Sequence, residues 1–183
     1  MTNAQSIPTN TQTTEAAQDA SWVIKNCVIP RNLSYDIERD LWCRNIRPDG
    51  LVQIGITDIG QTANGKIQSV TFPRINERLG KLIPARKTVA ILESAKWIGP
   101  INFAVDGVLV AVNKDLLDHP LWINLEPYQR GWIVDFLPME PLNWVFGETA
   151  RDAYRVRIGH TFQSVAGINE DFWCVHCNDW DDL

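Results

Sequence analysis

The segment Ile91-Leu-Glu-Ser-Ala-Lys-Trp-Ile-Gly-Pro100 carries the strongest indication of fold in this sequence of 183 residues. An apolar, β-prone run ends in Glu93-Ser94-Ala95, Lys96 follows, and Gly99-Pro100 favours a turn. Another apolar strand opens at Gly107, eleven residues beyond the lysine. The layout predicts a β-hairpin that presents one lysine at its tip, with a fixed backbone and a solvated amine. An enzyme that acylates a single amine needs such geometry, although a solvated turn lysine is by far the commonest alternative.

Short apolar strands separated by turn residues extend from about Trp22 to Pro138. Apolar and polar residues alternate from Leu51 to Ile56, as they do in a half-buried strand. The runs Val89 to Leu92 and Val108 to Val112 are continuous and aliphatic, which is typical of strands buried in a sandwich. The pattern predicts a mainly β fold.

Two short helices are expected to interrupt this strand pattern. One begins near Asp58, with Gln61 in a capping-box arrangement, and ends at Gly65. The other begins at Asn113, a good N-cap residue, and stops at Pro120.

Three parts of the chain differ in composition. Residues 1–21 are rich in Thr, Gln, Asn and Ala without periodicity, and they are expected to form a disordered N-terminal tail. Residues 22–138 form the predicted domain, and residues 139–183 form a C-terminal extension. The extension is expected to pack on something because it holds three of the eight tryptophans, Trp144, Trp173 and Trp180.

Composition and charge argue against several classes of partner. The formal net charge of −5 does not suit a nucleic-acid partner, because phosphate binding needs a basic surface. No apolar run reaches the roughly 18 residues of a membrane span, so no membrane partner is expected. The first twenty residues have neither an apolar core nor an arginine, which predicts a cytoplasmic protein and not a secreted or mitochondrial one.

Four cysteines, Cys27, Cys43, Cys174 and Cys177, are too few and too scattered for a secreted disulfide scaffold. Cys174 and Cys177 form a C-x-x-C pair around His176, but a structural zinc site usually needs a second ligand pair. We therefore expect no metal site and interpret the pair as ordinary thiols, with metal or redox use as the alternative.

Four blocks of residues occur in a distinctive order. They are Gly55-Ile56-Thr57-Asp58 with Gln61 and Gly65; Glu93-Ser94 with Lys96; Gly107, eleven residues after that lysine; and Asn124, Pro127, Tyr128, Gly131 and Trp132. Over roughly residues 33–138, this order and spacing resembles the H protein family of the glycine cleavage system. The resemblance implies a barrel-sandwich hybrid, the fold of lipoyl and biotinyl carriers, with short helices.

The resemblance also implies a lipoyl group in amide linkage to Lys96, on a carrier that has no catalytic residues of its own. Lipoate supplies a mobile cyclic disulfide, which no amino-acid side chain offers. Glu93 and Gly107 are the positions that a lipoate–protein ligase or another lipoylating enzyme is expected to read. Ser94 and Trp97 complete the expected environment of the arm. A biotin carrier would need methionines beside the lysine, and this chain has none there.

The chain departs from the H-protein pattern after the lysine. Trp97-Ile98-Gly99-Pro100 replaces a small polar stretch that commonly ends in an aspartate, and Asp40 stands where a histidine is usual. These changes resemble the H-like lipoate-binding proteins of the sulfur-oxidising heterodisulfide-reductase-like pathway. That resemblance implies an arm that shuttles sulfur species, with heterodisulfide-reductase-like or sulfurtransferase enzymes as partners.

Two alternatives stay open at this point. One is a glycine cleavage H protein that carries the aminomethyl group and works with the glycine cleavage P, T and L proteins. The other is an unlipoylated scaffold or interaction protein, which a measurement of intact mass would distinguish from a lipoylated carrier.

Overall fold

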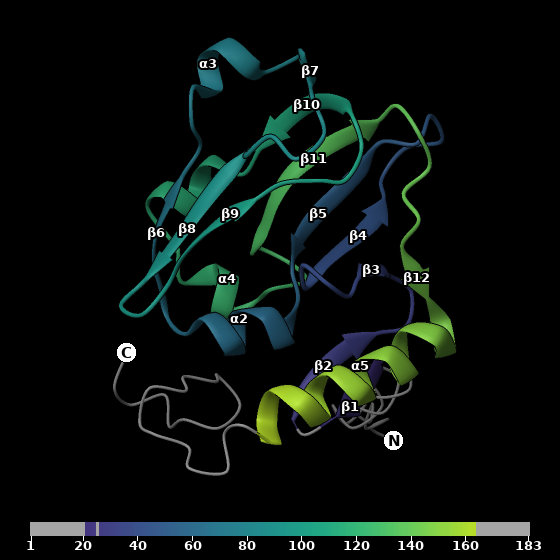
Figure 1. Cartoon of the computed structure of the whole chain (residues 1–183). Helices are drawn as coiled ribbons and strands as arrows, with labels where there is room; N and C mark the ends of the chain where they lie inside the picture. The colour runs from purple at the N-terminus through teal and green to yellow at the C-terminus, as the bar shows by residue number, and fades with distance from the viewer. Residues whose placement is uncertain (1–20, 25, 164–183) are drawn as a thin grey trace, which may run out of the picture.

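The computed structural model describes residues 21–24 and 26–163, and Figure 1 shows a small sheet lying over a larger curved sheet. The larger sheet has the strand order β12 (Val145–Phe146), β3 (Ser34–Asp36), β4 (Leu41–Asn45), β5 (Val52–Ile56), β11 (Trp132–Pro138), β10 (Gly107–Val112) and β7 (Leu82–Ile83). The smaller sheet has the order β6 (Ile67–Thr71), β8 (Ala90–Ser94) and β9 (Ile98–Ile101). A separate hairpin consists of β1 (Ser21–Ile24) and β2 (Cys27–Pro30). Every strand pair is antiparallel, so the predicted mainly β architecture is confirmed.

The helical segments are short, apart from the last one. They are α2 (Asp58–Asn64), α3 (Ile75–Arg78), the 3-10 helix η1 (Lys114–Leu117), α4 (Trp122–Leu125) and α5 (Gly147–Gln163). In Figure 1, α2 and α4 lie together at one end of the two larger sheets, and α5 runs beside the β1–β2 hairpin. The helix α2 connects β5 of the large sheet to β6 of the small one.

The main hydrophobic core fills the space between the two larger sheets. Ile54 and Phe136 reach it from the large sheet, and Val70 and Leu92 reach it from the small sheet. Burying such side chains contributes about 1.5–3 kcal/mol each. The paired apolar faces therefore hold the hairpin of β8 and β9 against the large sheet.

A second hydrophobic cluster lies between the large sheet, the β1–β2 hairpin and α5. Ala150, Tyr154 and Ile158 recur at every fourth position of α5 and are fully buried there. Tyr154 meets Tyr35 edge to face, with ring centroids 5.5 Å apart. Trp144, which precedes α5, packs against the main core. Described parts of the predicted C-terminal extension thus pack closely on the preceding domain.

Local details of two predicted helices differ from expectation. The N-cap of α2 is Thr57 and not Asp58, because the Thr57 hydroxyl accepts a hydrogen bond of 3.1 Å from the amide of Gly60. The second predicted helix is the 3-10 helix η1, and the Asn113 side chain makes no capping bond to it. The positions of the two helices were predictable from the sequence. The capping hydrogen bonds were not, because other groups in the fold compete for the same side chains.

The predicted turn at Gly99-Pro100 needs correction, whereas the predicted strand from Val108 to Val112 is present but irregular. Gly99 and Pro100 do not form a turn but lie within β9, paired with Leu92 and Ile91. In β10, a bulge between Leu109 and Ala111 shifts the pairing, and the strand buries mainly one face. Continuous apolar runs cannot distinguish one buried face from two.

Within residues 21–24 and 26–163, no helix has the length and apolar character needed to cross a bilayer. The same ranges contain no group of three His, Cys, Asp or Glu side chains that could hold a metal ion. Cys27 and Cys43 are both buried. The predicted C-x-x-C pair and two of the noted tryptophans lie outside the described residues: Trp173, Cys174, His176, Cys177 and Trp180.

Candidate functional site

Lys96 stands at the tip of the β8–β9 hairpin. The two strands stay paired up to Glu93 and Ile98, and the amide of Ser94 then donates a 2.8 Å hydrogen bond to the carbonyl of Trp97. Only Ala95 and Lys96 lie inside this closing bond, and both side chains are exposed. The predicted hairpin with an exposed lysine at its tip is therefore present, with the turn earlier than the Gly99-Pro100 signal suggested.

Ser94 fixes the backbone of the tip. Its hydroxyl donates a 2.7 Å hydrogen bond to the carbonyl of Asn64, the last residue of α2. The same oxygen accepts hydrogen bonds from the amides of Trp97, at 3.1 Å, and Lys96, at 3.4 Å. Serine side chains commonly order a turn in this way. One hydroxyl thus connects the lysine turn to the end of α2.

Gly65, which follows α2, lies under the side chain of Lys96. Its φ of 82° and ψ of −170° belong to a region that side chains other than glycine rarely adopt. A Cβ atom at this position would stand 2.9 Å from Cε of Lys96. The glycine therefore permits both the sharp change of direction after α2 and the close passage of the lysine stem.

A buried amide network lies beneath this glycine. Nδ2 of Asn124, in α4, donates to the carbonyl of Gly65 at 3.0 Å and to Oε1 of Gln61 at 2.7 Å. Oδ1 of Asn124 accepts a 2.8 Å bond from the amide of Ile67. Nε2 of Gln61 in turn donates to Oδ1 of Asp58 at 2.7 Å. Residues from two separate sequence blocks thus meet under the hairpin tip.

The network continues to the β1–β2 hairpin. Oδ2 of Asp58 accepts a 2.6 Å hydrogen bond from the amide of Val28. The Tyr128 hydroxyl donates to the carbonyl of Val28 at 2.6 Å and accepts from the amide of Asp58 at 3.0 Å. Burial raises the pKa of Tyr128 well above its usual value, so the hydroxyl stays protonated and can donate. These bonds hold α2 in place from its first turn to its last.

Glu93 and Trp97 flank the lysine in different ways. Glu93 is exposed, and its carboxylate accepts a 2.6 Å hydrogen bond from the hydroxyl of Ser69 on β6. Trp97 is half-buried against the main core, and its indole covers Gly99 so closely that a Cβ there would overlap the ring. Glu93 is therefore available to a partner at the surface, whereas much of the Trp97 ring is used in packing.

Gly107 lies apart from the hairpin tip. It begins β10, where it pairs with Ile83 and Pro138. A Cβ at Gly107 would overlap the ring of Phe136 and stand 2.7 Å from the carbonyl oxygen of Leu137. The structure thus brings Glu93, Ser94 and Trp97 to Lys96 but gives Gly107 a packing role elsewhere in the sheet.

Two partners of the site, the carbonyl of Asn64 and the hydroxyl of Ser69, are not predictable from the sequence. The carbonyl of Asn64 carries no signal in the sequence, because every residue has a carbonyl. Ser69 supports Glu93 across the β6–β8 pair, and only the strand register reveals that contact. The sequence places Asn124 in one of the four blocks but gives no role for it, whereas its three hydrogen bonds in the structure hold the turn after α2.

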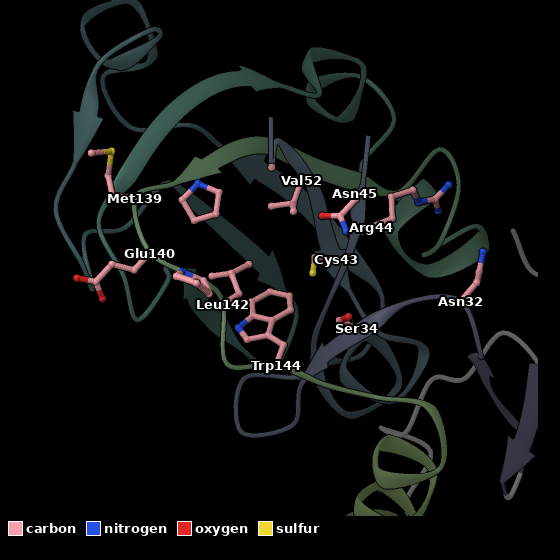
Figure 2. A pocket seen from close by; sticks show the side chains of 13 residues that line it. Asn32, Ser34, Cys43, Arg44, Asn45, Val52, Met139, Glu140, Leu142 and Trp144 are labelled. Atoms are coloured by element: carbon pink, nitrogen blue, oxygen red, sulfur yellow. The ribbon is translucent and has the colours of Figure 1, made fainter. Parts of the chain in front are cut away.

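A cavity of about 450 Å³ lies beside the end of β4 and the start of β5, as Figure 2 shows. Cys43 and Val52 border it from the strands, and Leu142 and Trp144 border it from the segment after β11. None of residues 93–97 lines this cavity. Burial raises the pKa of the Cys43 thiol to about 12, so the thiol is protonated at neutral pH and is a poor nucleophile. The cavity is therefore separate from the hairpin tip that carries Lys96.

Comparison with known proteins gives the same family from sequence and from structure. The family described as glycine cleavage H-protein matches residues 33–144. Glycine cleavage system H protein 3 of Aquifex aeolicus (strain VF5) is 39% identical over 118 residues, which cover 64% of this chain and 70% of that protein. Glycine cleavage system H protein 2 of the same organism is 44% identical over 117 residues, which cover 62% and 68% respectively.

A solved structure has a similar fold. The crystal structure of a glycine cleavage system H protein from Mycobacterium marinum matches this chain with a TM-score of 0.59 and 26% sequence identity. The match covers 72% of this chain and 99% of that one.

Proposed function

This chain belongs to the glycine cleavage H-protein family, and from that premise we propose that Lys96 is the residue that carries its lipoyl group. Proteins of this family are non-catalytic carriers with the barrel-sandwich fold of lipoyl carriers, and lipoate is attached covalently to a lysine. The observation that supports Lys96 is its place at the tip of a hairpin whose backbone Ser94 holds.

The surroundings of Lys96 fit a covalently attached arm. The side chain is exposed, and the stem follows the backbone of Gly65 without a side chain in its way. Lys81, Lys87 and Lys114 are exposed too, but none of them lies at the tip of a hairpin between two paired strands. A fixed backbone with an exposed lysine side chain is what a modifying enzyme needs.

The division of labour between cofactor and protein follows from this geometry. Lipoate supplies a cyclic disulfide that a nucleophile can open and that oxidation restores. The chain contributes the rigid mount: Ser94 orders the turn, and α2 supports it from below. Glu93 offers an exposed carboxylate three residues before the lysine, within reach of a lipoylating enzyme.

Intact mass and peptide mapping after co-expression with a lipoylating enzyme test the assignment. We expect one lipoyl group per chain, on Lys96, and none in Lys96→Arg. Lys81→Arg is the matched control, because it also removes an exposed lysine amine and should leave modification unchanged. Modification that persists in Lys96→Arg would overturn the proposal.

For the cargo, the aminomethyl group of glycine cleavage is the first candidate. The relatives from Aquifex aeolicus are named glycine cleavage system H proteins, which favours this cargo and the glycine cleavage P, T and L proteins as partners. Glu93 also keeps a carboxylate beside the arm, and this carboxylate can accept a charge-assisted hydrogen bond from a cationic group.

A sulfur species of a heterodisulfide-reductase-like pathway is the second candidate cargo. The observation that favours it is the apolar strand after the lysine, where Ile98 is 66% exposed and Pro100 is exposed as well. Position 100 therefore offers no carboxylate. The exposed part of the Trp97 ring could contact sulfur, and such contacts contribute about 0.3–1.5 kcal/mol.

Glycine–bicarbonate exchange with glycine cleavage enzymes separates the two cargoes. An exchange rate comparable to that of an authentic H protein would favour the aminomethyl group and eliminate the sulfur candidate. A rate near background that rises in Pro100→Asp would favour sulfur, because the variant restores a carboxylate at the edge of β9.

A further inference from the structure

Asn124 stands beneath the turn that joins α2 to β6. Its side chain is fully buried and spans the turn, donating to the carbonyl of Gly65 and accepting from the amide of Ile67. A second donor bond, to Gln61, fixes the orientation of its amide group. One donor and the acceptor of this side chain thus hold the turn, and the second donor anchors the side chain to α2.

The same turn forms the seat of the hairpin tip. The carbonyl of Asn64 accepts from the Ser94 hydroxyl, the backbone of Gly65 carries the stem of Lys96, and Ile67 pairs with Ser94 across the sheet. We define the turn seat as residues 64–67. Two of these three contacts are made by residues 65 and 67, the residues that Asn124 holds, and the third is made by Asn64, the immediate neighbour of Gly65.

We propose that Asn124 is a positioning residue for Lys96: it holds the turn seat and thereby sets the direction in which the lysine is presented to the enzyme that modifies it. The inference rests on the proposed attachment of lipoate at Lys96. Asn124 touches no reacting atom, so its effect passes through Gly65 and Ser94. A misplacement of about 1 Å at a reacting group can cost on the order of 100-fold in rate.

The alternative is that Asn124 only satisfies buried backbone groups, as many buried polar side chains do. Asn113 provides the matched comparison. It is buried too, and its Nδ2 donates to the carbonyls of Arg130 and Trp132 at 2.8 Å each. These bonds hold the start of β11 and make no contact with the turn seat.

The experiment measures lipoylation of the full chain by a purified lipoate–protein ligase with lipoate and ATP, in parallel with thermal unfolding. For Asn124→Ala we expect kcat to fall about tenfold or more, with a smaller change in KM, because the surface around Lys96 is intact and only its orientation changes. Asn113→Ala should lose similar thermal stability and keep the kcat of the unmodified sequence. Equal kcat values in the two variants, whether both high or both low, would overturn the inference.

Asn124→Ser keeps the measurement possible if Asn124→Ala does not fold, because it leaves a neutral polar group in the buried site. The serine side chain is too short to bond both the carbonyl of Gly65 and the amide of Ile67. We expect a loss of kcat, and a kcat like that of the unmodified sequence would contradict the positioning role. If the unmodified sequence itself is not lipoylated at Lys96, the attachment proposal fails, and the two failures are therefore distinguishable.

Discussion

The side-chain stem of Lys96 lies on the backbone of Gly65, so close that a Cβ atom on the glycine would stand 2.9 Å from Cε of the lysine. Gly65 also adopts a backbone conformation that is nearly restricted to glycine. We predict that Gly65→Ala lowers the free energy of unfolding by about 1–3 kcal/mol and turns the lysine away from its seat. Chemical denaturation measures the first effect, and the rate of lipoylation measures the second.

Gly50→Ala is the control for backbone strain. Gly50 has a φ of 90°, and a Cβ there would have no atom within 4 Å. The variant should lose stability through strain while its lipoylation rate stays unchanged. Equal lipoylation rates in Gly50→Ala and Gly65→Ala would show that the contact between Gly65 and Lys96 does not affect lipoylation.

The hairpin tip itself should contribute little to stability. Lys96 is exposed, and the turn is held by the hydroxyl and backbone of Ser94. We expect Lys96→Ala to change the free energy of unfolding by no more than about 0.5 kcal/mol, as exposed substitutions usually do, and to abolish carrier function. A large drop in melting temperature by calorimetry would contradict the picture of an exposed tip.

Trp97 should matter for stability more than its neighbour Lys96 does. Its indole covers Gly99 and packs against the main core, although the residue is only half-buried. Truncating a fully buried tryptophan costs about 3–5 kcal/mol, so we expect about 2 kcal/mol for Trp97→Ala. Urea denaturation measures the loss, and Ile98→Ala, which removes a side chain that is 66% exposed, is the control. A Trp97→Ala variant as stable as the unmodified sequence would contradict the packing role of the ring.

The hairpin and α2 were predictable because their signals are local. A polar turn between two apolar runs, and a helix that ends at Gly65, depend on residues within a few positions of one another. The roles of Asn124 and Gly107 were not predictable. Asn124 acts on Gly65, which is 59 positions away, and Gly107 is required by its fit against Phe136.

The helix α5 shows a signal that was present but weak. Ala150, Tyr154 and Ile158 recur at helical spacing, yet they form a narrow stripe among charged residues. Its partner surface comes from β1–β2 and β3, which lie more than a hundred residues earlier in the chain. Only the folded arrangement shows that this stripe completes the second hydrophobic cluster.

An ion pair between Asp40 and Arg157 joins α5 to the loop before β4. Nε and Nη2 of Arg157 donate to the two carboxylate oxygens of Asp40 at 2.7 and 2.5 Å. Asp40 is buried and Arg157 is about one-third exposed. Removing one partner of a fully buried pair costs about 3–5 kcal/mol, and the exposure of the arginine reduces the expected cost of Arg157→Met to about 2 kcal/mol.

The pH dependence of this variant should have a defined sign. Burial raises the pKa of Asp40 above its ordinary value, and the nearby charge of Asp36 acts in the same direction, whereas Arg157 lowers it. The folded protein therefore binds a proton more tightly at Asp40 than the unfolded chain does, so this group makes stability fall as pH rises from the ordinary pKa toward the raised one. Arg157→Met removes the lowering influence, which should extend that window to higher pH and so enlarge the loss of stability above the ordinary pKa of Asp40. Denaturation across this range measures the slope, and the double variant Asp40→Asn/Arg157→Met should abolish the added slope, because asparagine has no proton to titrate and tolerates the positive φ of 53° at this position. A slope in Arg157→Met that matches the unmodified sequence would mean that Asp40 is already held neutral in the folded protein, and that the pair is a hydrogen bond without ionic character.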